Sequence, residues 1–352
     1  MQTIALLFGG ASSEHSVSCV TAVGVFQAID KSKYRVVPIG ITRSGKFVSQ
    51  EVDLNWKLAD LPLVSESSPE VKIQPGSSSI EIHGERIGLD LVFPVLHGPN
   101  GEDGSVQGLI QLMGLPYAGN GVLASALAME KSKAKGVFRD AGLEVAKELV
   151  IERTSWSLAK DAELARAKAF VNGDVFVKPS RSGSSVGVTL VKDVAELEAA
   201  IELALSLDQT ALVEHRIYGR EVECAVLERP NGELVVSLAG EIVVTGREFY
   251  DFEAKYLDGG AELKVPTQLS DSELSQMHAL AIKAFRALGC SGLARTDFFL
   301  TETGFVLTEV NTMPGFTPIS MYPSLFAASG ISYSELVETL IQTGFARGTD
   351  PR

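Results

Sequence analysis

The chain has 352 residues, 45% of them hydrophobic and 21% charged, which is a globular composition with room for two or three domains. A formal net charge of −13 argues against nucleic acid or an anionic membrane as the main partner, but a local cluster of basic residues still permits an anionic cosubstrate. The three cysteines lack CxxC spacing, so we expect reduced thiols in a cytoplasmic protein and no zinc site.

The first segment predicts a strand at residues 3–8, a glycine turn and a helix at residues 17–29. A helix that begins after such a turn presents free N–H groups and a positive dipole end, which suits an anion. The dinucleotide fingerprint GxGxxG is absent, and the strand at 34–41 ends without an acid, so a dehydrogenase is disfavoured. Glu14 in the first turn either offsets the helix dipole or binds a ligand, and this stretch leaves both open.

The next apolar strand, at residues 90–96, follows a polar, Ser- and Pro-rich stretch (44–88). We expect this stretch to be a surface insertion or meander, with weak strand signals at 71–73 and 80–82. The strand ends in HGPNGEDG, which begins at His97. Ligands bind beyond the carboxyl ends of parallel strands, so the strand ends at Gly9 and His97 point to one crevice. A lone His at a strand end is more often structural, and we keep His97 as a candidate close to the site.

Residues 122–140 predict one helix with Lys131, Lys133 and Lys135, and such a run on a helix is usually a solvated face, so the pattern singles out none of them. A strand at 175–178 then carries Lys178 into the loop PSRSGSSVGV. The loop is not a Walker A motif, because it has no GK[ST] and enters a strand instead of a helix. We expect a hairpin flap whose N–H groups can close over a triphosphate.

Two acids flank the connection between the strands at 211–214 and 222–228. Glu214 ends the first strand and Glu221 precedes the second, an arrangement that suits recognition of adenine and ribose. Residues 245–260, TGREFYDFEAKYLDGG, predict an Ω-loop of the kind that covers an active site.

A β-hairpin is predicted at residues 294–311, with its turn at 301–304. Asp297 then lies opposite residue 308 or residue 309, depending on whether the loop has two or three residues. Since Glu309 and Asn311 share a face, both would converge with Asp297, and Arg295 is two places along the strand. Three oxygen ligands without Cys or His suit Mg²⁺ with substrate phosphates. The alternative is a solvated polar face.

Six segments resemble the D-alanine–D-alanine ligases, ATP-grasp enzymes of peptidoglycan synthesis: GGASSEHSVS, HGPNGEDG, VKPSRSGSSVGV, YDFEAKY, ARTDFFL and EVNTMPGFTPIS. They follow the family's order over nearly the whole chain. The resemblance implies an α/β fold, α+β in parts, with a three-domain ATP-grasp architecture and an N-terminal parallel-sheet (pre-ATP-grasp) domain. We expect the domains at 1–121, 122–215 and 216–352, with ATP between the last two.

The resemblance also implies the reaction. The carboxylate of one D-alanine attacks the γ-phosphate of ATP, and the amine of a second D-alanine captures the acyl phosphate. Glu14 would bind the ammonium of the first D-alanine and join Ser184 and Tyr256 in closing two loops over the site. Arg295 and the N–H of Gly315 would stabilise the charge that develops.

Further roles follow from the same resemblance. The residues near the two D-alanines would be His97 and Glu102 for the first, and Ser320 and Met321 for the second. The residues that contact ATP would be Lys131, Lys178, Ser185, Glu214, Ile217, Glu221 and Lys255. Asp297, Glu309 and Asn311 would hold two Mg²⁺ or Mn²⁺ ions.

The resemblance also bears on the product of the reaction and on the oligomeric state. D-alanine–D-lactate ligases usually carry His where this chain has Tyr256, so we expect a dipeptide product. The alternatives are a D-alanine–D-lactate ligase or another ATP-grasp carboxylate–amine ligase. A homodimer is expected, and activation by a monovalent cation stays open.

Overall fold

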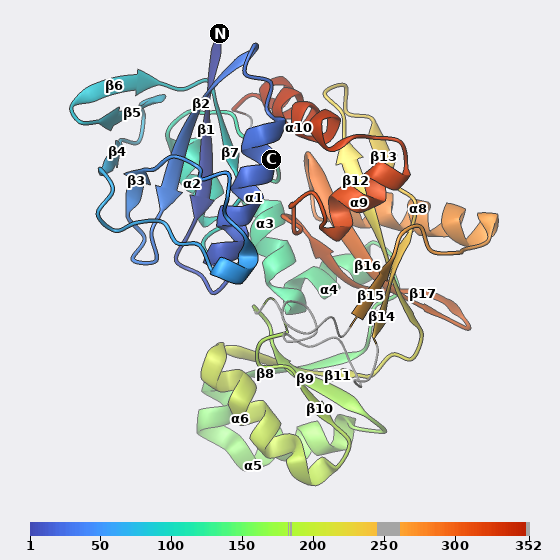
Figure 1. The fold of residues 1–352 in the computed structure, drawn as a ribbon. Coiled ribbons are helices and arrows are strands. Elements are labelled where there is room, and N and C mark those ends of the chain that lie inside the picture. Colours follow the sequence, from blue (N-terminus) through green and yellow to red (C-terminus); the bar gives the residue numbers. More distant parts are fainter. Residues whose placement is uncertain (182, 184, 245–260, 350–352) are drawn as a thin grey trace.

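The computed structural model describes residues 1–181, 183, 185–244 and 261–349, and these residues form three α/β bodies (Figure 1). No helix within these ranges has the length and apolar content needed to cross a membrane.

The first body is built on the strand order β3-β2-β1-β7. Its parallel strands are β1 (Gln2–Gly9), β2 (Tyr34–Ile41) and β7 (Leu91–Pro94), and β3 (Phe47–Ser49) pairs antiparallel with β2. The helices are α1 (His15–Ala28) and α2 (Ser105–Leu112). Because β1 pairs with β7 in parallel, Gly9 and the segment at His97 lie at the same edge, as the sequence predicted.

The stretch 44–88 is more than a surface insertion. It contains η1 (Leu58–Asp60) and an antiparallel sheet of β4 (Val71–Ile73), β5 (Ser79–Ile82) and β6 (Glu85–Gly88). Val71 and Ile80 are buried in one cluster with Ala5 and Leu7 of β1. The weak strand signals at 71–73 and 80–82 are confirmed as β4 and β5, and the stretch also helps to cover one face of the parallel sheet.

The helix expected at 122–140 is two helices, α3 (Val122–Met129) and α4 (Lys131–Asp140). Glu130 between them has a non-helical backbone, with φ −89° and ψ 87°. The buried side of α4, with Ala134 and Phe138, shares its apolar cluster with the C-terminal sheet. The three domain boundaries stay a prediction.

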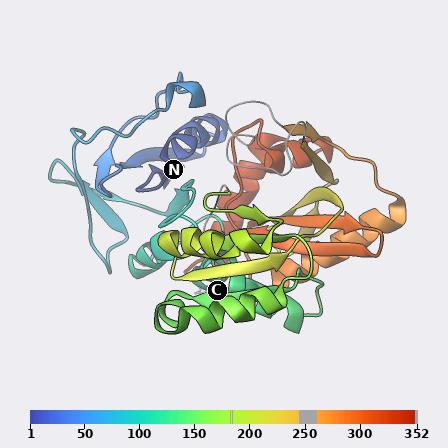
Figure 2. The same ribbon diagram turned by 90° about the horizontal axis from the view of Figure 1, so that it is seen from below.

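The second body is an antiparallel sheet in the order β10-β9-β11-β8. Its strands are β8 (Glu148–Glu152), β9 (Val175–Pro179), β10 (Thr189–Val191) and β11 (Thr210–His215). The helices α5 (Arg153–Phe170) and α6 (Leu197–Leu207) pack on one face, and η2 (Val194–Glu196) precedes α6 (Figures 1 and 2). The hairpin predicted around the Ser/Gly loop is confirmed, since Val177 pairs with Thr189.

The third body is a sheet in the order β15-β14-β12-β16-β17, with β13 also paired to β12. The strands are β12 (Arg220–Glu228), β13 (Leu234–Val236), β14 (Gly240–Val244), β15 (Ala261–Lys264), β16 (Leu293–Thr301) and β17 (Gly304–Asn311). The helices are α8 (Asp271–Ala287), α9 (Met321–Ala328) and α10 (Tyr333–Arg347). A capping box between Ser270 and Glu273 begins α8.

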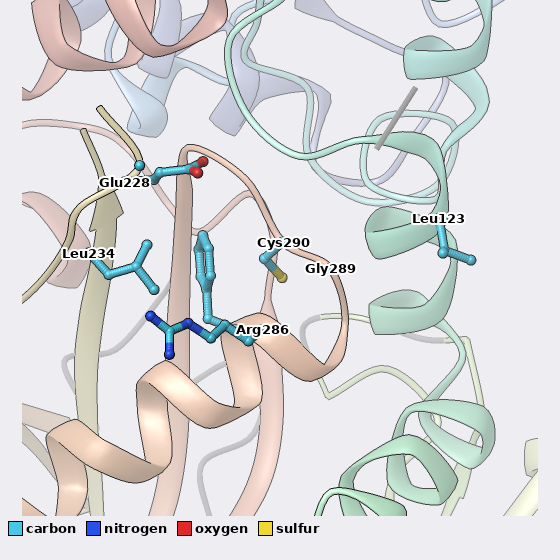
Figure 3. A pocket seen from close by; sticks show the side chains of 8 residues that line it. Leu123, Glu228, Leu234, Arg286, Gly289 and Cys290 are labelled. Atoms are coloured by element: carbon cyan, nitrogen blue, oxygen red, sulfur yellow. The ribbon is translucent and has the colours of Figure 1, made fainter. Parts of the chain in front are cut away.

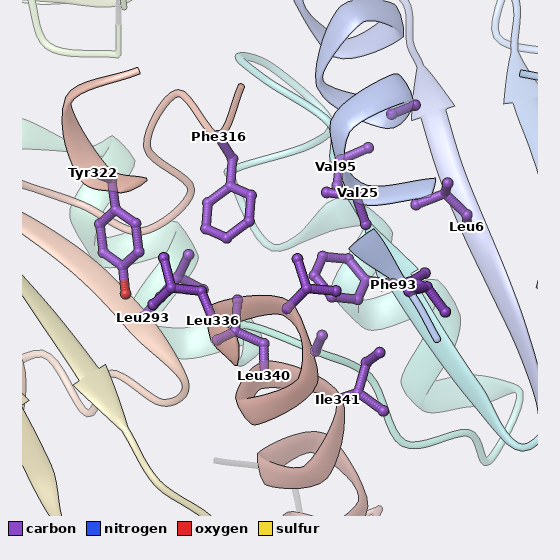
Figure 4. Close-up of a cluster of buried hydrophobic side chains, with 14 of the residues drawn as sticks. Leu6, Val25, Phe93, Val95, Leu293, Phe316, Tyr322, Leu336, Leu340 and Ile341 are labelled. Atoms are coloured by element: carbon purple, nitrogen blue, oxygen red, sulfur yellow. The ribbon is translucent and has the colours of Figure 1, made fainter. Parts of the chain in front are cut away.

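One apolar cluster joins the first body to the C-terminal helices. In Figure 4, Phe93 and Val95 of the first body lie near Phe316, Leu336 and Ile341 of the C-terminal segment. All of these side chains are at most 2% exposed. The first and third bodies therefore share a continuous core, which fixes their relative position.

Candidate active site

A β-bulge sets the geometry of the hairpin β16–β17. The loop has two residues, because Thr301 pairs with Gly304, and this register alone would place Asp297 opposite residue 308. The register shifts between Asp297 and Phe298, so that Asp297 faces Glu309 and Arg295 faces Asn311. Thr308 is the extra residue, and its hydroxyl donates to the carbonyl of Asp297 at 2.7 Å. The bulge therefore brings Glu309 and Asn311 onto the face of Asp297.

This face carries alternating charges. The guanidinium of Arg295 donates to both carboxylate oxygens of Asp297, at 2.8 and 2.7 Å. Its Nε also lies 3.0 Å from Oε2 of Glu223 on β12. Lys131 approaches from α4, with Nζ 3.9 Å from Oε2 of Glu309. Burial alone lowers the pKa of Arg295, but Asp297 and Glu223 raise it well above its ordinary value.

The donor set fits a hard divalent cation. Asp297 and Glu309 are directly opposite, Asn311 is two residues further, and all three offer oxygen. In the part of the chain that the structure describes, no three His, Cys, Asp or Glu side chains gather as a metal site. Two carboxylates and one amide thus form a partial set, which suits Mg²⁺ because this ion usually keeps waters and substrate phosphates.

Glu14 lies where the first and second bodies meet. A Cβ added to Gly98 would lie only 2.8 Å from Oε2 of Glu14, and one added to Gly183 would lie 3.8 Å from the same oxygen. Gly98 follows β7, whereas Gly183 belongs to the loop between β9 and β10. Gly98 also has φ +75°, so a side chain there would be strained as well as blocked. The structure thus brings Glu14, the His97 segment and the Ser/Gly loop together.

His97 is buried and connects three segments. Its Nδ1 lies 3.5 Å from Oε1 of Glu102 and 3.3 Å from the carbonyl of Met313, and its Nε2 lies 3.1 Å from the hydroxyl of Thr21. Burial alone lowers the pKa of His97, but Glu102, together with Glu14, raises it above its ordinary value. Burial likewise raises the pKa of Glu102, against the opposing effect of His97. The native state therefore favours protons on this pair.

Glu214 holds two lysines at the end of β11. Its Oε1 accepts from Nζ of Lys178 at 3.0 Å, and its Oε2 accepts from Nζ of Lys135. Burial raises the pKa of Glu214, but Lys178 and Lys135 outweigh it and lower the pKa to about 2. Glu214 is therefore an ionised acceptor inside the protein, with Lys178 as one of its partners.

Residues of the connection from β11 to β12 form hydrogen bonds with Asp174. Arg216 and Tyr218 reach the Asp174 carboxylate at 3.1 Å each, and the Arg216 N–H donates to the Asp174 carbonyl at 3.0 Å. Ile217 between them is half-buried. Glu221 lies just beyond, on β12 and opposite Ile242.

The segment before α9 forms a compact turn. The hydroxyl of Ser320 lies 2.7 Å from that of Thr317 and accepts from the Thr317 N–H at 3.1 Å. A Cβ added to Gly315 would lie 3.2 Å from this same hydroxyl oxygen. Ser320 occupies the N-cap position of α9, without a capping hydrogen bond from its side chain, and Met321 begins the helix, so the positive end of a helix faces this turn. Gly315 and Ser320 are thus brought together.

Of the remaining predicted residues, the structure describes Ser185. Ser185 belongs to the loop between β9 and β10 and has φ +58°. Ser184, Tyr256 and Lys255 lie outside the described residues, so their predicted roles stay predictions.

We compared two pockets of the structure with these residues. One of about 310 Å³ lies beside Gly10, His97 and Ser105, at the carboxyl edge of the parallel sheet. The other, of about 420 Å³, is lined by Glu228, Arg286 and Cys290 and contains none of the predicted site residues (Figure 3). The Glu228 carboxylate already accepts from Ser291, so we do not assign the second pocket to the site.

Sequence reasoning missed two charged residues of the site. Glu223 is 1% exposed, and its signal was an acid inside the apolar run Val-Glu-Cys-Ala-Val. Lys135 is also 1% exposed, so the expectation of a solvated lysine face on α4 was wrong for it. Only Lys133 of the three lysines is exposed. The spacing from Lys131 to Lys135 places both on one face of the helix, but does not reveal which face is covered.

Three α/β bodies that meet around this set of carboxylates and lysines define an ATP-grasp ligase. Models of the D-ala D-ala ligase N-terminus and of the D-ala D-ala ligase C-terminus match residues 3–120 and 137–342. The chain therefore belongs to the D-alanine–D-alanine ligase family, whose members are ATP-dependent.

Individual relatives agree over almost the full length. A D-alanine–D-alanine ligase of Mycolicibacterium vanbaalenii is 47% identical, with 99% of this chain and 98% of the relative covered. The structure of the VanG D-Ala:D-Ser ligase from Enterococcus faecalis has a TM-score of 0.86 and 37% identity, covering 97% and 99% of the two chains. The D-alanine–D-alanine ligase from Coxiella burnetii has a TM-score of 0.83 and 35% identity, covering 99% and 94%.

Proposed function

We propose that the protein joins two D-alanines to D-alanyl-D-alanine, with ATP converted to ADP and phosphate. The observation that carries this proposal is the position of Glu14. Its carboxylate lies against Gly98 of the first body and near Gly183 of the nucleotide loop. An ammonium bound there would place the adjoining amino acid between the first body and the loop that faces the phosphates.

In the first step, the carboxylate of one D-alanine attacks the γ-phosphorus of ATP, and ADP leaves. Glu14 pairs with the ammonium of this D-alanine, and the buried pair of His97 and Glu102 stands beside it. Lys131 and Lys178 offset the phosphate charge, while Ser185 and Lys255 add contacts from the two loops. Phosphoryl transfer needs this positioning and charge neutralisation more than covalent help from the protein.

In the second step, the amine of the second D-alanine attacks the carbonyl carbon of the acyl phosphate. Phosphate leaves and the amine loses a proton as the peptide bond forms. Arg295 and the N–H of Gly315 stabilise the oxyanion. Ser320 and Met321, at the positive end of α9, receive the second carboxylate.

The nucleotide lies between the second and third bodies. Glu214 accepts from the adenine amino group, Ile217 contacts the ring, and Glu221 holds the ribose hydroxyls. Asp297, Glu309 and Asn311 would hold two Mg²⁺ or Mn²⁺ ions, which neutralise phosphate charge when bound. Ser184 and Tyr256 join Glu14 in closing the loops, which keeps water from an acyl phosphate that would otherwise hydrolyse.

We further propose a cytoplasmic homodimer that supplies peptidoglycan synthesis. The domains for these roles would be 1–121, 122–215 and 216–352. The relatives named D-alanine–D-alanine ligase over their full length support the dipeptide as product, whereas the D-Ala:D-Ser ligase among the similar structures makes D-serine a necessary comparison.

Product identification tests the function. The protein with Mg-ATP is incubated with D-alanine alone and with D-alanine plus D-serine or D-lactate, and the products are identified by mass spectrometry. We expect D-alanyl-D-alanine as the main product, with one phosphate released per peptide bond. Equal phosphate release with L-alanine, or a main product containing D-serine or D-lactate, would contradict the proposal. Glu309→Gln is expected to abolish turnover while the protein stays folded.

A further inference from the structure

Lys135 on α4 is a buried lysine with two hydrogen-bond acceptors and a further carboxylate nearby. Its Nζ donates to Oε2 of Glu214 and to the carbonyl of Ala146 at 3.3 Å, and lies 4.0 Å from Oε2 of Glu148. Two acceptors and one further carboxylate thus surround the ammonium group. Burial, together with the charge of Lys178, lowers the pKa of Lys135 below its ordinary value against the raising effect of Glu214 and Glu148, and the ion-pair geometry is that of a charged lysine.

The lysine stands in a chain of alternating charges. Arg139 donates to both oxygens of Glu148 at 2.7 and 2.9 Å, Glu148 adjoins Lys135, and Lys135 and Lys178 share Glu214. These five groups carry three positive and two negative charges. Both ends of the chain are positive: Arg139, whose side chain is 48% exposed, and Lys178, whose side chain is 17% exposed.

This arrangement affects both ends of a bound nucleotide. Without Lys135, Glu214 would neutralise Lys178 and would be free to turn both oxygens toward it. With Lys135 present, Oε2 is held on the α4 side, and the charge of Lys178 is only partly compensated. An ionised, fixed carboxylate accepts from the amino group of adenine but repels the carbonyl oxygen that guanine has at the same ring position.

We propose that Lys135 is a positioning residue for the nucleotide: it fixes Glu214 as an acceptor for adenine and leaves the charge of Lys178 available to a phosphate. This inference rests on the proposed placement of ATP between the second and third bodies. It adds a residue of α4, which does not itself touch the nucleotide, to the determinants of adenine specificity.

A purely structural ion pair is the rival explanation. Loss of one partner of a buried pair is destabilising whatever the pair's function. Stability alone therefore does not separate the two explanations. The ratio of ADP affinity to GDP affinity does, because a structural role would not change which base is preferred.

The experiment measures binding of ADP and of GDP, each with Mg²⁺, by isothermal titration calorimetry. We expect Lys135→Met to weaken ADP binding at least tenfold and to reduce the preference for ADP over GDP at least fivefold. Lys133→Met is the matched control on the same helix, since Lys133 is exposed, and its binding should equal that of the wild type.

A second variant covers the case that Lys135→Met does not fold, as judged by circular dichroism. Lys135→Gln keeps a donor for Glu214 but loses the charge, so ADP binding should again weaken at least tenfold. The double variant Lys135→Met/Glu214→Gln should have no larger effect on base preference than Glu214→Gln alone, because Lys135 acts through Glu214.

The outcomes separate the inference from the proposed function. An unchanged preference for ADP over GDP in a folded Lys135 variant overturns the inference whatever the ADP affinity, as does a wild type that binds neither nucleotide. Because ADP binding needs no D-alanine, a wild type that binds ADP but forms no dipeptide contradicts only the proposed function.

Discussion

The first and second bodies meet the rest of the molecule through different chemistry. The first body shares an apolar core with the C-terminal segment, in which Phe93 and Val95 lie near Phe316 and Ile341 (Figure 4). The second body has its own cluster, whose side chains come from residues 149–213. It meets α4 through polar contacts: Lys135 with Glu214, Arg139 with Glu148, and Ser180 with Glu130.

The two kinds of joint allow different amounts of relative motion between the bodies. An apolar joint is stabilised by close packing and has one favoured position. A joint of ion pairs and hydrogen bonds loses less when it opens, because water replaces the lost partners, so relative motion is the default expectation for such an interface. We therefore expect the second body to move as a unit about α4, while the first and third stay fixed.

The largest effect is expected at the apolar joint. Phe316 is 0% exposed and packs its ring 5.6 Å from that of Tyr322 and 5.4 Å from that of Tyr333. Phe316→Ala should lower the free energy of unfolding by about 3–5 kcal/mol, as measured by urea unfolding. Ile319→Ala is the control, because Ile319 is 86% exposed and should change stability by less than about 0.5 kcal/mol. If Phe316→Ala costs less stability than the variant of the charged joint, the contrast between the two joints is contradicted.

A smaller effect is expected at the charged joint. Arg139 of α4 donates to both carboxylate oxygens of Glu148 on β8, at 2.7 and 2.9 Å, and the Arg139 side chain is 48% exposed. Arg139→Met should therefore cost only about 1 kcal/mol in global stability. Amide exchange in β8 should become faster, because one of the contacts that hold the second body to α4 is lost. Unchanged exchange, or a loss as large as that for Phe316→Ala, would contradict the polar character of this joint.

The smallest effect is expected in the pH dependence of stability, through His97. The raised pKa values of His97 and Glu102 mean that the native state binds these protons more strongly than the unfolded state does. The stabilisation from His97 is present below pH 6.5, its unfolded value, and is lost as the pH rises through the folded pKa. Thermal unfolding of the wild type and His97→Gln between pH 6 and 9 should show a difference that shrinks with rising pH. Parallel curves would exclude this linkage.

Much of the fold could be predicted from the sequence, because apolar periods and glycine turns report local structure. The parallel strands with their shared edge and the Ser/Gly hairpin were both expected and confirmed. The break at Glu130 and the burial of residues 44–88 against the parallel sheet were not, since each depends on what packs against it. The periodicity of α4 could not show that a second body covers Lys135.

The candidate site was predicted in part for the same reason. Alternation along a strand placed Glu309 and Asn311 on one face, but loop length alone could not decide between residues 308 and 309 opposite Asp297. The bulge places Glu309 opposite Asp297, and no pattern in the sequence predicts the bulge. The partners Glu223 and Lys135 come from distant segments, and their roles depend on contacts that only the folded chain brings about.

The bulge at Thr308 also isolates the carboxylate face from the turn of its own hairpin. A strand that carries a bulge cannot slide along its neighbour without moving the extra residue, so the register is fixed near Asp297 and not at the loop. The turn at Glu302 and Thr303 is consequently free to change in length. It is a suitable place to insert a foreign peptide, such as an affinity tag or a fluorescent label, without displacing Glu309 from its partner.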